Sequence, residues 1–159
     1  MEAPEIIQIP DKKLIAMRIS MSIADNKTRE LWQGFRPRIS EIKNRIGTDF
    51  YSLQHYPQGF DLKAFTPNVQ FERLAAIEVS DHSEVPEGME AYMLAGGQYA
   101  VFTHHGPATA FARTFQFIFG IWLPASDFEL DVRDHFEILP ADYRPDDPNA
   151  TEKVWIPIR

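Results

Sequence analysis

Polar and apolar residues alternate in the first strongly patterned segment of the chain, residues 13–22. Ile15, Met17, Ile19 and Met21 occupy alternate positions of this segment. A repeat of two, rich in branched side chains, is typical of a β-strand that buries one of its faces. The pattern therefore predicts a half-buried strand.

A helical repeat follows over residues 25–47. Proline lacks a backbone N–H and clashes with the preceding turn, so Pro37 should kink or split this helix. Gly47 is a suitable residue to end it. The apolar residues recur at steps of three or four, as on one face of an amphipathic helix: Leu31, Phe35, Ile39, Ile42 and Ile46.

The same order of elements is then predicted a second time. Strand–helix–strand–strand occurs twice, which indicates one domain over 1–159 with similar halves of about 1–82 and 83–159. The expected later elements are strands over 49–57 and 69–80, a strand over 89–106 with a bulge at Gly96–Gly97, a helix over 107–124, and strands over 134–143 and 151–158.

Two βαββ halves of this kind favour an α+β fold. Their strands can form one antiparallel sheet with the two main helices on one face. The other face is then left partly uncovered. We expect a ligand cleft on that uncovered, helix-free face.

Glu137 is the most informative residue of the predicted strands, because it interrupts an apolar run. Successive side chains of a strand point to opposite faces, so Glu137 lies opposite to Phe136 and Ile138. In the last strand, Trp155 lies opposite to the apolar set that contains Val154. If the apolar sets face the helices, Glu137 and Trp155 meet on the open face.

A carboxylate beside an indole suits a lipophilic cation, because the carboxylate neutralises the charge and the ring face attracts it. The alternative is a solvent-facing glutamate that pairs with Lys153. If Glu137 is buried instead, its pKa should rise, and it becomes available as a general acid or base.

Composition excludes several classes of function. The formal charge of -7 disfavours direct nucleic-acid binding, and the absence of cysteine excludes disulfides and thiolate chemistry. Neither a signal peptide nor a membrane span is recognisable, so we expect a cytoplasmic protein. The five histidines have no ligand spacing and Gly96–Gly97 lacks a phosphate-loop pattern, so we expect neither a metal nor a cofactor. Aromatic residues make up 13%, enough to line a cavity as well as a core.

The second half resembles the GyrI-like small-molecule-binding domain, which is also the effector-binding domain of AraC- and MerR-type multidrug-responsive regulators. The resemblance rests on "GGQYAVFTHHGP", "FQFIFGIWLPAS" and "DHFEILPADYRPDDPNATEKVWIPI". It implies a duplicated βαββ fold with a central cleft for bulky, often cationic aromatic compounds. It also implies a pocket glutamate, matched by Glu137, and an aromatic residue on the last strand, matched by Trp155. The other candidate wall residues are Phe50, Tyr51, Tyr92, Phe102 and Trp122.

The family's regulators carry a helix-turn-helix module, for which the chain leaves no room before its first predicted strand. We therefore expect a stand-alone binding module that senses or sequesters lipophilic, cationic aromatic molecules. One alternative is a hydrolase that opens cyclopropane-bearing alkylating natural products with Glu137. Another is a protein-interaction role, with DNA gyrase or a separate DNA-binding regulator as the partner.

Overall fold

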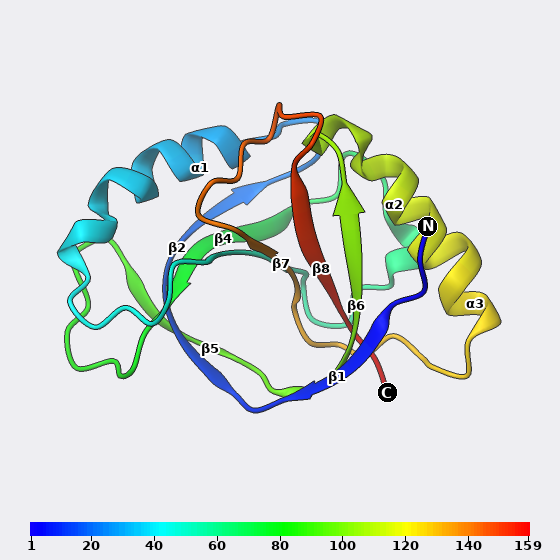
Figure 1. Ribbon diagram of the computed structural model, residues 1–159, viewed down its shortest axis with the longest axis horizontal. Coiled ribbons are helices and arrows are strands. Elements are labelled where there is room, and N and C mark those ends of the chain that lie inside the picture. Colours follow the sequence, from blue (N-terminus) through cyan, green and yellow to red (C-terminus); the bar gives the residue numbers. More distant parts are fainter.

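A curled antiparallel sheet of eight strands forms the centre of the protein in a computed structural model that describes residues 1–159 (Figure 1). The order of strands across the sheet is β1-β6-β8-β7-β3-β4-β2-β5. The strands are β1 (Glu5–Ile9), β2 (Lys12–Met21), β3 (Phe50–His55), β4 (Phe71–Glu78), β5 (Glu90–Leu94), β6 (Gly97–His105), β7 (His135–Leu139) and β8 (Thr151–Pro157).

The first main helix is split at Pro37, as predicted. Its α-helical part, α1 (Thr28–Phe35), passes directly into the 3-10 helix η1 (Arg36–Glu41), with Pro37 in the first turn of the 3-10 part. The helix does not continue to Gly47, because the backbone becomes extended at Ile42.

The second main helix is one continuous helical run made of short segments that differ in helix type. It runs through η3 (Ala108–Ala110), α2 (Phe111–Phe117), the π-helical turn η4 (Ile118–Trp122) and α3 (Leu123–Ala125). A further 3-10 turn, η2 (Leu62–Ala64), lies in the loop between β3 and β4. No helix combines the length and the apolar character that crossing a membrane requires.

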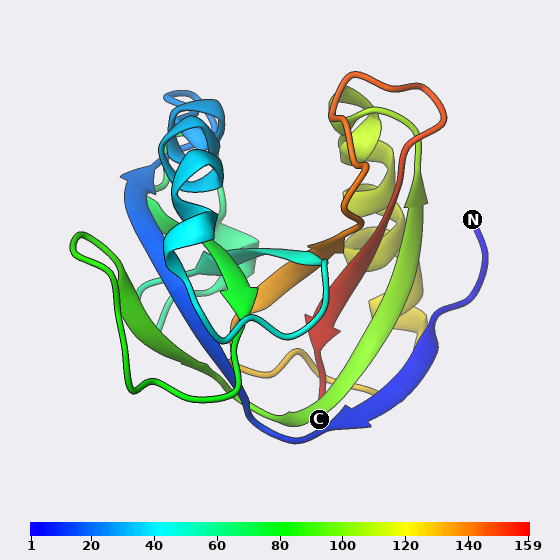
Figure 2. The same ribbon diagram turned by 60° about the vertical axis from the view of Figure 1, so that its left-hand side comes forward.

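The predicted α+β fold with duplicated βαββ units is confirmed. The first unit is β2-α1-β3-β4 and the second is β6-α2-β7-β8, and both contribute to one antiparallel sheet. The units meet in the middle, where β3 pairs with β7. Both main helices stand on the same face of the sheet, one over each half (Figure 2).

Two short strands exchange between the halves. β1 precedes the first unit but pairs with β6, and β5 precedes the second unit but pairs with β2. The prediction of one strand over 89–106 was wrong, and β1 was not predicted. The chain turns at Gly96 and Gly97 instead: Gly97 has φ +136°, which other residues rarely adopt, and Gly96 lies so close to residues 9–11 that a Cβ would come within 2.6 Å of their backbone.

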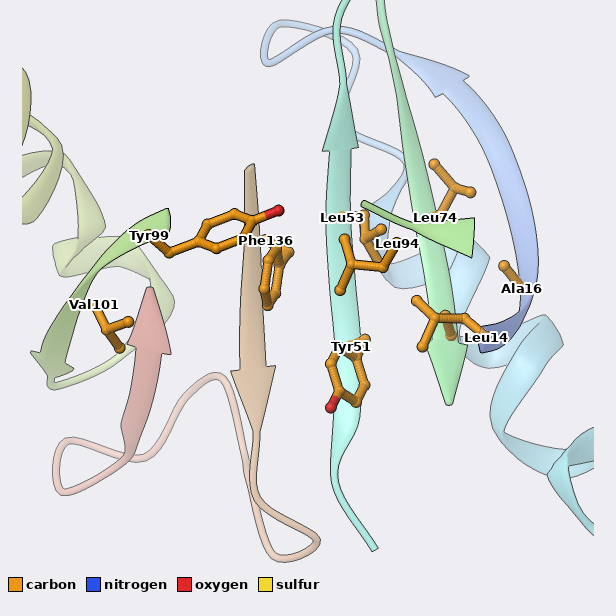
Figure 3. Packing of buried hydrophobic residues seen from close by; sticks show 10 residues of the cluster. Leu14, Ala16, Tyr51, Leu53, Leu74, Leu94, Tyr99, Val101 and Phe136 are labelled. Atoms are coloured by element: carbon orange, nitrogen blue, oxygen red, sulfur yellow. The ribbon is translucent and has the colours of Figure 1, made fainter. Parts of the chain in front are cut away.

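The helix-free face of the sheet is filled by the protein's own side chains. The sheet curls around an apolar cluster that includes Leu14, Leu53, Leu74, Tyr99 and Phe136, all of them nearly inaccessible (Figure 3). Two separate clusters lie on the other face, one under each helix. The middle of the helix-bearing face is therefore the part of the sheet that the core leaves open.

Candidate functional site

The main cavity lies between the two helices, above the central strands of the sheet. It has a volume of about 910 Å³, and its lining includes residues of both α1 and α2. We expected the cleft on the helix-free face, and this position was wrong. The curled sheet encloses that face around a core, whereas α1 and α2 stand apart on the other face (Figure 2).

The floor of the cavity is polar, although it belongs to the most buried strands. β3 lies between β4 and β7, so side chains from three adjacent strands meet there. The pairs across the strands are Gln54 with Arg73, Gln54 with His135, and Ser52 with Glu137. Such a row of buried polar groups needs hydrogen-bond partners, from the protein or from a ligand.

Glu137 lies at the centre of this floor. Its carboxylate Oε2 accepts a hydrogen bond of 2.8 Å from Gln54 Nε2. Burial raises the pKa of Glu137 above its ordinary value, and the charge of Arg73 and the bond from Gln54 offset only part of this effect. Glu137 is therefore a carboxyl group whose ionised form is poorly solvated and would gain from a cationic neighbour.

A second carboxyl group, Glu152, faces the same cavity from β8. Glu137 pairs across the strands with Val154, so Glu152, two residues away, lies on the same face. Only 7% of Glu152 is exposed, and burial, then the charge of Glu137, raises its pKa to about 7. Burial and Glu152 likewise raise the pKa of the neighbouring Tyr143 hydroxyl. Near neutral pH this pair of glutamates retains a proton more readily than exposed carboxylates do.

Arg73 and His135 complete the floor. Arg73 Nη1 donates a hydrogen bond of 3.0 Å to Ser52 Oγ. Burial lowers the pKa of His135 to about 4, so its imidazole is neutral at pH 7. The ring of Phe119 stacks on this imidazole, with centroids 5.9 Å apart. The floor thus has one permanent cation, two acids and a neutral imidazole.

The walls of the cavity are aromatic. On the second helix, Phe115 and Phe119 contact each other at 4.6 Å between ring centroids, and Phe65 contacts Phe115 at 6.3 Å. On the first half, Trp32 meets Phe50 edge to face at 5.8 Å. The aromatic residues of the lining are Trp32, Phe50, Tyr56, Phe65, Phe71, Phe111, Phe115, Phe119 and Tyr143. These rings can hold a flat apolar body by stacking and edge contacts.

The structure places Glu137 and Phe50 in the lining of the cavity and the other predicted site residues outside it. The expectation that Glu137 and Trp155 share a face was wrong, because Trp155 pairs with Phe136 and stacks on it at 5.3 Å. Tyr51 and Tyr92 also pack against the core of the curled face.

Phe102 and Trp122 lie on the helix-bearing face, but in the core beneath the second helix. Their rings meet edge to face at 5.2 Å. Phe102 is 1% exposed, so it cannot reach a ligand without a rearrangement of this core.

Several lining residues were missed, although the chain carried a signal for some of them. Ser52 and Gln54 are polar residues at alternate positions of an otherwise apolar strand, the same pattern that singled out Glu137. Arg73 and Glu152 also occupy strand positions. Pattern alone does not place them together, because they come from β3, β4 and β8. No group of three or more His, Asp or Glu side chains is arranged to hold a metal ion.

Comparisons with known proteins agree with this fold. The model of the GyrI-like small molecule binding domain family matches residues 2–159. The transcriptional regulator BrlR of Pseudomonas aeruginosa is 32% identical over 155 residues, which cover 96% of this chain and 54% of the regulator. The chain thus spans about half the length of this curated relative.

Three solved structures share the fold at low identity. SAV2435 bound to tetraphenylphosphonium has a TM-score of 0.70 at 14% identity, over 100% of this chain and 94% of that one. EcmrR in its complex with DNA has a TM-score of 0.71 at 10% identity, over 98% and 56% of the two chains. A hydrolase encoded by lin2189 from Listeria innocua has a TM-score of 0.62 at 12% identity, over 99% and 92%.

Proposed function

The chain belongs to the family of GyrI-like small-molecule binding domains, and from this premise we propose that its cavity captures lipophilic, cationic aromatic molecules in the cytoplasm. The observation that carries the proposal is the pair of acids, the half-buried Glu137 and the buried Glu152, on the floor of an aromatic-walled cavity of about 910 Å³. That volume is in the range of drug-sized binding sites.

Two physical effects support a cationic ligand. A cation near Glu137 and Glu152 stabilises their ionised forms, which burial otherwise penalises. A cation over an aromatic ring gains about 0.5–2 kcal/mol, with the larger value for desolvated sites. The walls supply such rings close to the acids, because Phe119 stacks on His135, two residues from Glu137 on the same strand.

The relatives support the same ligand class. One structural neighbour is bound to tetraphenylphosphonium, an aromatic cation, and the regulator BrlR indicates that domains of this kind occur in transcription regulators. We therefore propose that the domain senses or sequesters its ligand. The predicted protein partners, a DNA-binding regulator or gyrase, stay predictions.

A titration with tetraphenylphosphonium and ethidium, followed by calorimetry or dye fluorescence, tests the proposal. We expect both cations to bind, and Glu137→Gln to weaken binding about tenfold, because one charged contact is worth about 1.5 kcal/mol. Glu84→Gln is the matched control, because Glu84 is exposed and outside the cavity. The proposal is contradicted if neither cation binds. It is also contradicted if the cations bind to Glu137→Gln as tightly as to the wild type.

A hydrolase is the second candidate, and the presence of two acids in one cavity favours it. Glu137 would take a proton from water, whose oxygen attacks a cyclopropane carbon of a flat alkylating compound. The ring C–C bond then breaks, and Glu152, with its pKa of about 7, would protonate the carbonyl oxygen that receives the electrons.

Mass spectrometry of a cyclopropane-bearing alkylator incubated with the protein tests this candidate. Hydrolysis adds the mass of one water to the compound, and Glu137→Gln should slow that step about a hundredfold or more. If the compound binds but its mass does not change, the hydrolase is excluded and the binding module remains.

A further inference from the structure

Arg73 is a cation on the cavity floor without an ion-pair partner. It comes from β4 and belongs to the cavity lining, yet no carboxylate oxygen lies within the 4.0 Å that defines a salt bridge. Its one side-chain hydrogen bond goes from Nη1 to Ser52 Oγ. Its Nε is enclosed and has no acceptor.

An arginine in this state has unused hydrogen-bonding capacity. Its guanidinium is always charged and has several N–H donors in one plane, which match the two oxygens of a carboxylate. A buried donor without an acceptor costs free energy, so a ligand that supplies the acceptor gains affinity. Arg73 therefore offers a binding position for an oxygen group.

The charge of the lining points in the same direction. Three arginines, Arg29, Arg36 and Arg73, line the cavity against two acids, Glu137 and Glu152. Burial disfavours the ionised form of both acids, and His135 is neutral at pH 7. A ligand that carries positive charge alone would therefore leave the enclosed Nε of Arg73 without an acceptor.

We propose that the preferred ligand is zwitterionic: beside its aromatic body and cationic group it carries a carboxylate that binds the guanidinium of Arg73. This inference rests on the proposed function and narrows its ligand class. Arg73 reaches over β3, where its guanidinium donates to Ser52, and Ser52 pairs across the strands with Glu137. The carboxylate and the cationic group of the ligand should therefore lie on the same side of the aromatic body, the side that faces the floor.

Two dyes provide a matched test. Rhodamine 123 is a cationic methyl ester, and rhodamine 110 is the same xanthene dye with a free carboxylate. We expect the wild-type protein to bind rhodamine 110 about tenfold more tightly than rhodamine 123, as measured by fluorescence anisotropy, because a charge-assisted bidentate contact is among the strong hydrogen bonds.

Substitutions of Arg73 then assign the preference to this residue. Arg73→Met should remove the preference for rhodamine 110, because it should weaken the binding of this dye about tenfold and the binding of rhodamine 123 less. Arg73→Lys should retain part of it, since it keeps the charge but loses the planar pair of donors. Arg113→Met is the charge-matched control, because Arg113 is exposed on α2 outside the cavity. Circular dichroism checks that each variant is folded.

The outcomes separate this inference from the proposed function. If rhodamine 123 binds as tightly as rhodamine 110, or if the ratio of their affinities is unchanged in Arg73→Met, the zwitterionic ligand is excluded and the cation-binding cavity stands. If neither dye binds the wild-type protein, the inference and the proposed function both fail. Preference for rhodamine 110 that disappears in Arg73→Met supports both.

Discussion

At the scale of single residues, the charge of the cavity floor depends on two glutamates that lie in a low-dielectric environment. Burial raises the pKa of both Glu137 and Glu152, because a buried carboxylate loses its hydration. Arg73 offsets part of this cost, and Gln54 stabilises Glu137 further with a hydrogen bond. Protonation of the floor is thus linked both to folding and to ligand binding.

We predict that Glu152 makes the protein less stable as pH rises. Its folded-state pKa of about 7 lies above the unfolded value of 4.5, so the folded state binds the proton more tightly. The unfolding free energy therefore falls between about pH 4.5 and pH 7, by up to about 3 kcal/mol at about 1.4 kcal/mol per pH unit.

Urea titrations of the wild type and Glu152→Gln over this pH range measure the effect. The stability of Glu152→Gln relative to the wild type should increase with pH, whatever the absolute cost of the substitution. Glu84→Gln serves as the exposed control and should follow the wild type. If the unfolding free energies of Glu152→Gln and the wild type differ by the same amount from pH 4.5 to pH 7, Glu152 has the same pKa in the folded and unfolded states and the prediction is wrong.

Cation binding should have the opposite pH dependence. A bound cation favours the ionised acids, so below about pH 7 binding has to release a proton, and affinity should rise with pH and level off above about pH 7. Calorimetry of tetraphenylphosphonium binding in buffers of different ionisation enthalpy measures the proton release. An affinity that is the same at pH 5.5 and pH 8 would argue against ionised acids in the complex.

At the scale of elements, the breaks in the regular structure shape the cavity. Pro37 converts the end of the first helix into a 3-10 turn, and the second helix contains the π-helical turn that carries Phe119. Such π-turns are rare overall, but many of those that occur are found at functional sites. Gly96 and Gly97 lie where the chain passes from β5, at one edge of the sheet, to β6, which lies next to β1 near the other edge.

Two glycine substitutions should therefore have opposite effects. Gly96→Ala should destabilise the protein by about 1–3 kcal/mol, because its Cβ would meet backbone atoms of Ile9, Pro10 and Asp11 at 2.6 Å. Gly34→Ala should stabilise it by about 0.5–1 kcal/mol, because Gly34 is helical and exposed, with no atom in the way. Thermal unfolding of both variants measures the difference; stability unchanged in Gly96→Ala would contradict the close approach.

At the scale of the whole molecule, the two halves depend on each other. β1 completes the sheet of the second half, β5 completes that of the first, and β3 pairs with β7 across the middle. The cavity has the same dependence, since Glu137 and Glu152 belong to the second half and Arg73, Ser52 and Gln54 to the first. The pocket exists only where both halves are joined.

Separate fragments should show this dependence. We expect 1–82 and 83–159 each to be largely unfolded, because each lacks an edge strand and exposes the central strand that pairs with the other half. Mixing them should restore β-structure and cation binding, as followed by circular dichroism and dye titration. A fragment 83–159 that folds cooperatively alone would show that the halves are independent domains.

The sequence by itself determined the repeated strand–helix–strand–strand order, the change of helix at Pro37 and the unusual position of Glu137, because these depend on local periodicity and on the cost of a carboxylate in an apolar strand. It did not determine the face on which Glu137 lies. That depends on how the sheet curls: the curl encloses Trp155, Tyr51 and Tyr92 in a core and leaves the space between the helices open. Tertiary structure alone also brought Arg73 and Glu152 to the same floor, since pairing between distant strands decides which polar residues meet.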